Sequence, residues 1–341
     1  MNEIATFLKT IVETMGVSGN EKAITSLFET AIHPYMDSVE YDNFGNLIAH
    51  KKGKGRKVML IAHADEVGFI VKHIDEHGFV YIQEIGGIDT NLLPGREIVF
   101  TGINGEKVIG IIGKRPIHLQ EKDKPKDWEC EELWVDIGAG SQKKALGRVD
   151  IGCYGSYAPK FEMLGKHLVK SKALDDRCGI AVLLGVAKQL FQEEPNCDLF
   201  LVCSVQEELG ARGAHTAADK IKPDVAIAID VTHATDYPSM SVVKNGNIRL
   251  GRGAVVAYGP NIDVTVTDML INAANDSNTK IQKEVLSRPT GTDINPIQIY
   301  GTGVKTALLS IPCRYMHTPV EIVSLKDIKS AITILTKYLT I

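Results

Sequence analysis

Two adjacent glutamates stand directly after an apolar run in the middle of the chain. Residues 199–214 read LFLVCSVQEELGARGA, so Glu207 and Glu208 separate the run from a glycine-containing turn. The run contains β-branched and aromatic residues and is too short for a buried helix, which predicts a buried strand. Ligands of open α/β sheets bind at the carboxyl ends of the strands. Alternatively, the pair merely begins a helix, whose dipole favours carboxylates there.

A histidine and an aspartate follow a second apolar run. Residues 57–62 read KVMLIA and predict a short buried strand, and His63, Ala64 and Asp65 come next. At a strand end, an imidazole can bind a metal ion while a nearby carboxylate orients the ring. The alternative is a histidine that only hydrogen-bonds within the fold.

Two aspartates precede a predicted helix. Asp175 and Asp176 are followed by apolar residues with a helical period over residues 180–191. Capping of the helix explains one aspartate. The second is unexplained, because adjacent carboxylates repel each other unless a cation or Arg177 offsets their charge. Spacing alone does not decide which of the two binds a ligand.

Two more strand ends carry ligand-type residues. Residues 223–229 predict a strand that ends on Asp230, and His317 follows a predicted strand over residues 304–311. His233 is expected in a loop. Histidine and carboxylate ligands suit zinc or cobalt, and one bridging carboxylate could join two such ions. Water between two ions ionises near neutral pH, and a free carboxylate beside it can carry its proton.

The rest of the sequence predicts an α/β chain with a β-rich insertion. Helices are expected in residues 1–16 and 21–32, then a hairpin over residues 38–50. Between residues 67 and 160, short strand-like runs alternate with glycine turns and no helix is evident, which predicts a small barrel or sandwich. The later elements are a helix, a strand and a closing helix, expected over residues 263–274, 280–286 and 324–339.

Several residues outside these motifs could contact a substrate. Residues 114–132 are rich in charge and proline and predict a long exposed loop, which contains His118 and Gln120. Asp293 lies in a second, turn-rich connection. A glycine-containing segment with three basic residues could bind an acidic side chain or form solvated surface. These residues are Lys244, Arg249 and Arg252.

Composition excludes some classes of partner. The 341 residues are 44% apolar and 23% charged, with a net charge of −4, which predicts a globular protein without a nucleic-acid or membrane partner. The apolar stripe of residues 1–16 is interrupted by charges, so it fits neither a signal peptide nor a membrane span. Six scattered cysteines read as reduced core residues, and we therefore expect a cytoplasmic protein.

Five segments, taken together, resemble a known family. In chain order they read HADEVGF, ALDDRCG, VQEELGARGA, AIDVTHA and RYMHTPVE, and they are similar to the dinuclear metallo-aminopeptidases of peptidase family M42. The resemblance covers essentially the whole chain. It implies a mixed-sheet, zinc-peptidase-like catalytic domain in residues 1–66 and 161–341. It also implies an inserted PA-like β-barrel for dimerisation in residues 67–160, with dimers that assemble into a dodecamer.

The resemblance also implies the site and the reaction. Two divalent metal ions, zinc or cobalt, would be held by five residues: His63, Asp175, Glu208, Asp230 and His317. Asp175 would bridge the ions, Glu207 would be the general base, and Asp65 would orient His63. A metal-bridging hydroxide would then hydrolyse N-terminal residues from peptide substrates.

Two other functions remain open from the sequence. Some members of this family carry an endo-1,4-glucanase label, but glycoside hydrolysis needs two carboxyl groups about 5 to 9.5 Å apart and no metal. The strand-end histidines would then have no role. A non-catalytic protein on the same scaffold would be expected to lack some ligands, and none is missing here.

Overall fold

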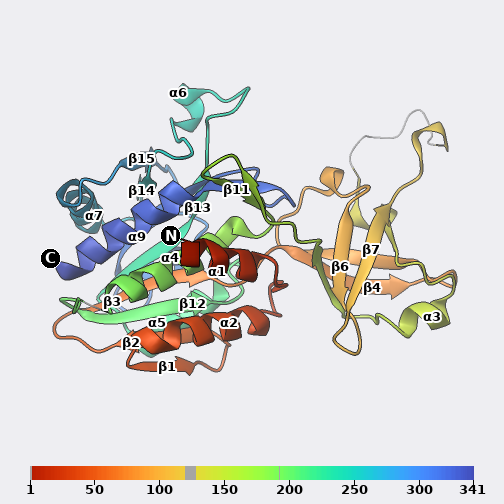
Figure 1. Cartoon of the computed structure of the whole chain (residues 1–341), viewed down its shortest axis with the longest axis horizontal. Coiled ribbons are helices and arrows are strands. Elements are labelled where there is room, and N and C mark those ends of the chain that lie inside the picture. Colours follow the sequence, from red (N-terminus) through yellow and green to blue (C-terminus); the bar gives the residue numbers. More distant parts are fainter. Residues whose placement is uncertain (1, 120–127, 192) are drawn as a thin grey trace.

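The chain folds into an α/β body and a separate β-barrel, which lies to the right of the body in Figure 1. The computed structural model describes residues 2–119, 128–191 and 193–341. Both termini lie in the body, and the barrel is an insertion between β3 and β10. The fold is therefore the α/β architecture with a β-rich insertion that the sequence predicts.

The body is built on an 11-stranded mixed sheet whose central strands are parallel. These strands are β12 (Asp198–Ser204), β3 (Lys57–His63), β13 (Val225–His233) and β16 (Lys305–Arg314). Strands β3 and β16 are buried along nearly their whole length, because helices cover both faces of the sheet, and they therefore read as continuous apolar runs. The outer strands are β1 (Ser38–Tyr41), β2 (Leu47–Lys51), β17 (Glu321–Ser324), β11 (Leu168–Ser171), β10 (Glu162–Leu164), β14 (Ala254–Tyr258) and β15 (Ile281–Val285).

Helices cover both faces of this sheet and bury two apolar cores. The larger core includes α1 (Asn2–Val12), α2 (Lys22–Ile32), α4 (Leu174–Gln189), α7 (Val264–Asp276) and α9 (Leu325–Thr340). The smaller core, on the opposite face, includes α5 (Arg212–Ile221) and α8 (Ile294–Gln298). Helix α4 packs on β3 and β13 and against α1 and α9, so its first turn is fixed beside the carboxyl ends of the parallel strands. The short α6 (Val242–Asn245) extends from the body on a loop.

The insertion is a closed barrel with its own apolar core. Its strands, in barrel order, are β4 (Gly68–Ile74), β5 (Val80–Ile85), β8 (Trp134–Asp136), β7 (Lys107–Gly113), β6 (Glu97–Thr101) and β9 (Tyr154–Tyr157). Burial alternates along β7, as expected for a barrel strand with one face inside. The outward face of β7 exposes Ile109 and Ile111.

Two local expectations were wrong. The insertion contains a short helix, α3 (Gln142–Leu146), whose five residues are too few to show a helical period. Strand β13 continues beyond Asp230 to His233, because it pairs with β16 as far as Cys313.

All six cysteines are free thiols, and five of them are buried. In the part of the chain that the structure describes, no helix is both long and apolar enough to cross a bilayer.

Candidate active site

The parallel strands bring His63 and Asp230 to one edge of the sheet. Ile61 in β3 pairs with Ala228 in β13, and each of the two site residues lies two positions further along its strand. The register therefore puts their side chains at the same level and on the same face. This placement follows directly from the two apolar runs that form β3 and β13.

The glutamate pair reaches the same edge through a sharp turn. Strand β12 ends at Ser204, whose register partner in β3 is His63. Gln206 then takes a left-handed backbone conformation with φ of 56°, and the chain turns before Glu207 and Glu208. Glu207 Oε2 lies 4.0 Å from His63 Nε2, and both side chains are buried.

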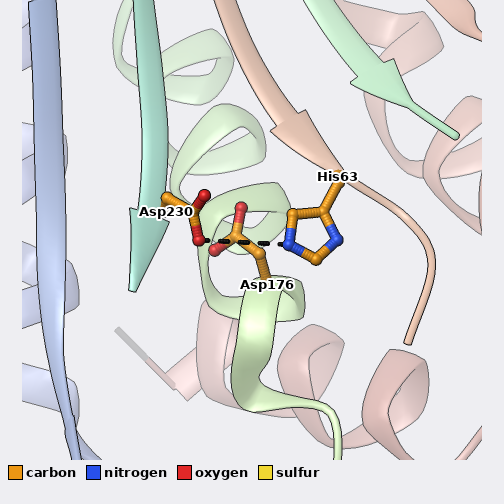
Figure 2. A group of neighbouring side chains, drawn as sticks. All are labelled: His63, Asp176 and Asp230. Atoms are coloured by element: carbon orange, nitrogen blue, oxygen red, sulfur yellow. Dashed lines mark ion pairs between the residues drawn. The ribbon is translucent and has the colours of Figure 1, made fainter. Parts of the chain in front are cut away.

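Three buried side chains form the inner cluster, which we define as His63, Asp176 and Asp230. Each offers a ligand atom, and these atoms lie within 4.8 Å of one another. Figure 2 shows His63 and Asp230 pointing toward each other from adjacent strands, with Asp176 between them at the start of α4. The distance from His63 Nε2 to Asp230 Oδ1 is 3.9 Å.

The outer cluster, which we define as Asp175, Glu208 and His317, meets the same criterion. His317 Nε2 lies 3.2 Å from Glu208 Oε1 and 3.3 Å from Asp175 Oδ2. The side chain of His317 is 32% exposed, whereas that of His63 is 2% exposed. The two clusters therefore differ in their access to solvent.

Asp175 contacts the histidines of both clusters. Its Oδ1 lies 3.2 Å from His63 Nε2, and its Oδ2 lies 3.3 Å from His317 Nε2. A cis peptide bond joins it to Asp176. Burial alone would raise the pKa of Asp175, but hydrogen bonds with His317 and His63 hold it well below its ordinary value. One carboxylate thus divides its two oxygens between two imidazoles.

The charges in these clusters fit divalent cations. Burial raises the pKa of Asp176, and the charge of Asp230 raises it further. Burial also raises the pKa values of Asp230, Glu207 and Glu208. Asp176 Oδ2 is buried and has no hydrogen-bond partner in the described chain. Crowded, buried carboxylates are stable as anions only beside compensating positive charge, and carboxylates together with two imidazoles form a donor set that divalent metal ions can bind.

Comparison with known proteins now gives the family. Residues 45–334 match the family model described as M42 glutamyl aminopeptidase. The chain belongs to the M42 family. It is 39% identical over 332 residues to the lysyl aminopeptidase of Pyrococcus furiosus, covering 95% of this chain and 93% of that relative. This M42 protein is therefore an aminopeptidase, a hydrolase, as the sequence motifs predict.

Two solved structures bear on its assembly and on the alternative function. One is the TET1 peptidase of Pyrococcus horikoshii, titled as able to assemble into a tetrahedron or a large octahedral shell; it is 30% identical, with a TM-score of 0.87, covering 98% of this chain and 99% of that one. The other, from Thermotoga maritima, is titled an endoglucanase; it is 27% identical, with a TM-score of 0.80, covering 97% of this chain and 96% of that one. Most of this M42 chain therefore shares its fold with both.

In this M42 aminopeptidase, Asp65 contacts His63, its predicted partner, and also other residues of the site. Its backbone carbonyl lies 3.2 Å from His63 Nδ1, and its Oδ1 lies 3.4 Å from the same atom. The carboxylate also accepts the backbone N–H groups of Glu207 and Glu208, each at 3.0 Å, and the hydroxyl of Ser18 at 2.5 Å. One buried carboxylate thus links the histidine of the inner cluster to the turn that carries the glutamate pair.

The sequence interpretation missed two contacts to His317. Its Nδ1 lies 2.8 Å from the carbonyl oxygen of Gly87, which follows β5 of the barrel. Its backbone N–H donates to Glu321, four residues along the chain. Glu321 lies in the RYMHTPVE segment, close to His317 in the sequence, so the sequence did offer a signal for this contact. Gly87 is 230 residues away and offers no chemical signal in the sequence.

The remaining candidates lie in three settings. Asp293 is buried, and its Oδ2 accepts a 2.5 Å hydrogen bond from Ser204. His118 is exposed in a short 3-10 helix of the insertion, and Gln120 lies outside the described residues. The three basic candidates for an acidic substrate side chain are all exposed: Lys244, Arg249 and Arg252.

Proposed function

We propose that this M42 aminopeptidase holds two divalent metal ions and removes N-terminal residues from peptides, with Glu207 as the general base. The observation that carries the proposal is the position of Asp175, whose two oxygens face one imidazole in each cluster. A carboxylate in that position can bridge two ions. Each histidine also has a separate carboxylate within reach, which gives each ion its own ligands.

The inner ion would be held by His63, Asp175 and Asp230, and the outer ion by Asp175, Glu208 and His317. Asp176 is the competing bridge, because it lies in the inner cluster. However, its Oδ1 accepts the backbone N–H of Gly179 at 3.0 Å, which stabilises the first turn of α4. Nitrogen and oxygen donors of this kind suit zinc or cobalt.

The protein groups have distinct tasks. Bound ions would lower the pKa of a coordinated water and polarise the scissile carbonyl. Glu207 Oε2 would accept the proton of the attacking water and return it to the leaving amine nitrogen. Asp65 holds the Glu207 backbone in place, so the base is positioned before substrate binds. His63 and His317 would bind metal through Nε2, since Nδ1 of each faces a carbonyl oxygen.

We extend the proposal to assembly and location. Exposed Ile109 and Ile111 on the outer face of β7 support dimerisation through the barrel. The tetrahedral and octahedral assemblies named for the Pyrococcus horikoshii relative support a homo-oligomer, which we propose to be a dodecamer built from dimers. Six free cysteines support a reducing compartment such as the cytoplasm.

The direct test uses a panel of aminoacyl p-nitroanilides and carboxymethylcellulose as substrates. Protein stripped of metal is assayed before and after zinc or cobalt is restored. Metal-dependent hydrolysis of the aminoacyl substrates alone is the expected result, and the panel ranks the N-terminal preference. Glucan hydrolysis that survives chelation, with no aminoacyl hydrolysis, would refute the proposal and favour the glucanase.

A further inference from the structure

Glu321 is a buried carboxylate at the start of β17, directly behind the outer cluster. It is 2% exposed, and Ser171, at the end of β11, is its register partner. Among the described residues, no basic side chain forms an ion pair with it. A buried carboxylate without a cationic partner is costly unless its oxygens accept good hydrogen bonds.

Both of its oxygens accept backbone N–H groups of residues in the outer cluster. Glu321 Oε2 accepts the N–H of Asp175 at 3.1 Å, and Oε1 accepts the N–H of His317 at 2.8 Å. Asp175 is 146 residues away in the chain. One side chain therefore holds the backbone N–H groups of both Asp175 and His317.

The backbone at His317 needs such support. His317 has a φ of 61°, and Tyr315 shares this left-handed conformation, although neither residue is glycine. This conformation is unfavourable for residues with a Cβ and persists where surrounding contacts hold it. The bonds to Glu321 and to the Gly87 carbonyl hold the backbone and the ring, respectively.

The backbone of the glutamate pair, Glu207 and Glu208, is likewise held by a buried carboxylate. Asp65 uses its two carboxylate oxygens to accept the N–H groups of Glu207 and Glu208. The site therefore contains two buried carboxylates that each bind the backbone of two neighbouring functional residues.

We propose that Glu321 is a positioning residue for the outer metal ion. It fixes the backbone of Asp175 and His317, so that the distance between their ligand atoms is already set before an ion binds. The inference rests on the dinuclear site proposed above. Loss of a group that orients metal ligands typically weakens metal affinity by about 10- to 100-fold, and we expect that loss for the outer ion.

The variants are Glu321→Gln and Glu321→Ala. Glutamine keeps one acceptor oxygen and replaces the other with an NH₂ group, so it should cost less affinity than alanine. Asp327→Asn is the matched control. Asp327 is also a buried carboxylate that accepts two backbone N–H groups, those of Gly251 at 2.6 Å and Gly253 at 2.7 Å, and neither belongs to a cluster.

The measurement is a cobalt titration of metal-stripped protein, followed by visible absorption and by the metal retained after dialysis. Wild type and Asp327→Asn should bind two ions per chain. Glu321→Gln should bind one ion with little change and the other about 10- to 100-fold more weakly. The thermal midpoints of the metal-free proteins, compared with that of Asp327→Asn, separate this effect from general loss of stability.

A double-mutant cycle identifies the weakened ion. His317→Ala should bind only the inner ion, so adding Glu321→Gln to it should leave the affinity for that remaining ion unchanged. Wild-type affinity for both ions in Glu321→Gln and Glu321→Ala would overturn the inference. Equal weakening of both ions, or the same weakening in Asp327→Asn, would also overturn it. A wild type that binds fewer than two ions would instead refute the proposed dinuclear site.

Discussion

Asp175 contacts the histidines of both the inner and the outer cluster, but different parts of the fold hold these two histidines. His63 is the last residue of a central strand and is 2% exposed, and sheet register sets its distance from Asp230. His317 lies in a loop, is 32% exposed, and depends on a glutamate and on a barrel carbonyl. A sheet fixes ligands through many backbone hydrogen bonds, whereas a loop needs individual side chains to do so.

This difference predicts different behaviour of the two proposed ions. The inner ion would be surrounded by buried side chains on rigid strands and should exchange slowly. The outer ion would be reached from solvent and should leave first when a chelator is added. The barrel contributes to this outer site, because Val67 and Tyr157 line a small cavity together with His317. The insertion therefore helps to shape the site, in addition to any role in assembly.

The largest effect should come from Asp175→Ala, which removes the carboxylate that contacts the histidines of both clusters. We expect loss of both ions and a fall in kcat/KM of more than about 10⁴-fold, since ligands and catalysis are lost together. Metal analysis and p-nitroanilide kinetics check this. Retention of one tightly bound ion would show that the clusters do not depend on a shared ligand.

Glu207→Gln should reduce kcat by about 10²- to 10⁴-fold, because glutamine cannot accept the proton of the attacking water. The backbone bond to Asp65 is unchanged, so two ions per chain should remain. Glu208→Gln is the matched comparison, one residue along the chain, and should lose affinity for the outer ion. Equal metal loss in both variants would contradict the separate roles.

The histidines themselves should differ in their effect on stability. In metal-free protein, His63→Ala should lower the free energy of unfolding by about 3 kcal/mol or more, because it leaves buried carboxylates uncompensated. His317→Ala should cost less than His63→Ala, because the His317 side chain is 32% exposed and solvent can reach the carboxylates that it leaves unpaired. Denaturant unfolding measures both values. Equal costs would remove the distinction between the clusters.

Asp65→Asn should reduce kcat/KM by about 10- to 100-fold, since one of the two oxygens that hold the glutamate turn becomes an amide nitrogen. Ser18→Ala removes a single donor to the same carboxylate and should cost less. Steady-state kinetics of the two variants provides the test. A larger loss in Ser18→Ala would argue against the proposed role of Asp65.

Gly87→Ala should give the smallest effect. The added Cβ would lie 3.4 Å from His317 Nδ1, an ordinary contact, so affinity for the outer ion should change by about two- to threefold and the inner ion should be unaffected. Cobalt titration measures both affinities. A greater change at the inner ion would mean that the barrel loop does not act through His317.

The sequence was sufficient to predict the strands that carry the site but insufficient for the contacts that orient it. Apolar runs ending in acidic residues or histidine predicted where β3 and β12 deliver His63 and Glu207, because a buried parallel strand has a clear compositional signal. The sequence could not distinguish Asp175 from Asp176 as the bridging ligand, since the direction of each side chain depends on the local backbone geometry. Nor could it find Gly87, because a backbone carbonyl has no side-chain signature.

The most direct test of the account is a two-step metal titration coupled to activity. Metal-stripped protein is titrated with cobalt while bound metal and hydrolysis of an aminoacyl p-nitroanilide are followed together. The account predicts two ions per chain, a weaker second step that is lost in His317→Ala, and activity that depends on bound metal. Full hydrolysis in metal-free protein, or saturation at a single ion, would contradict it.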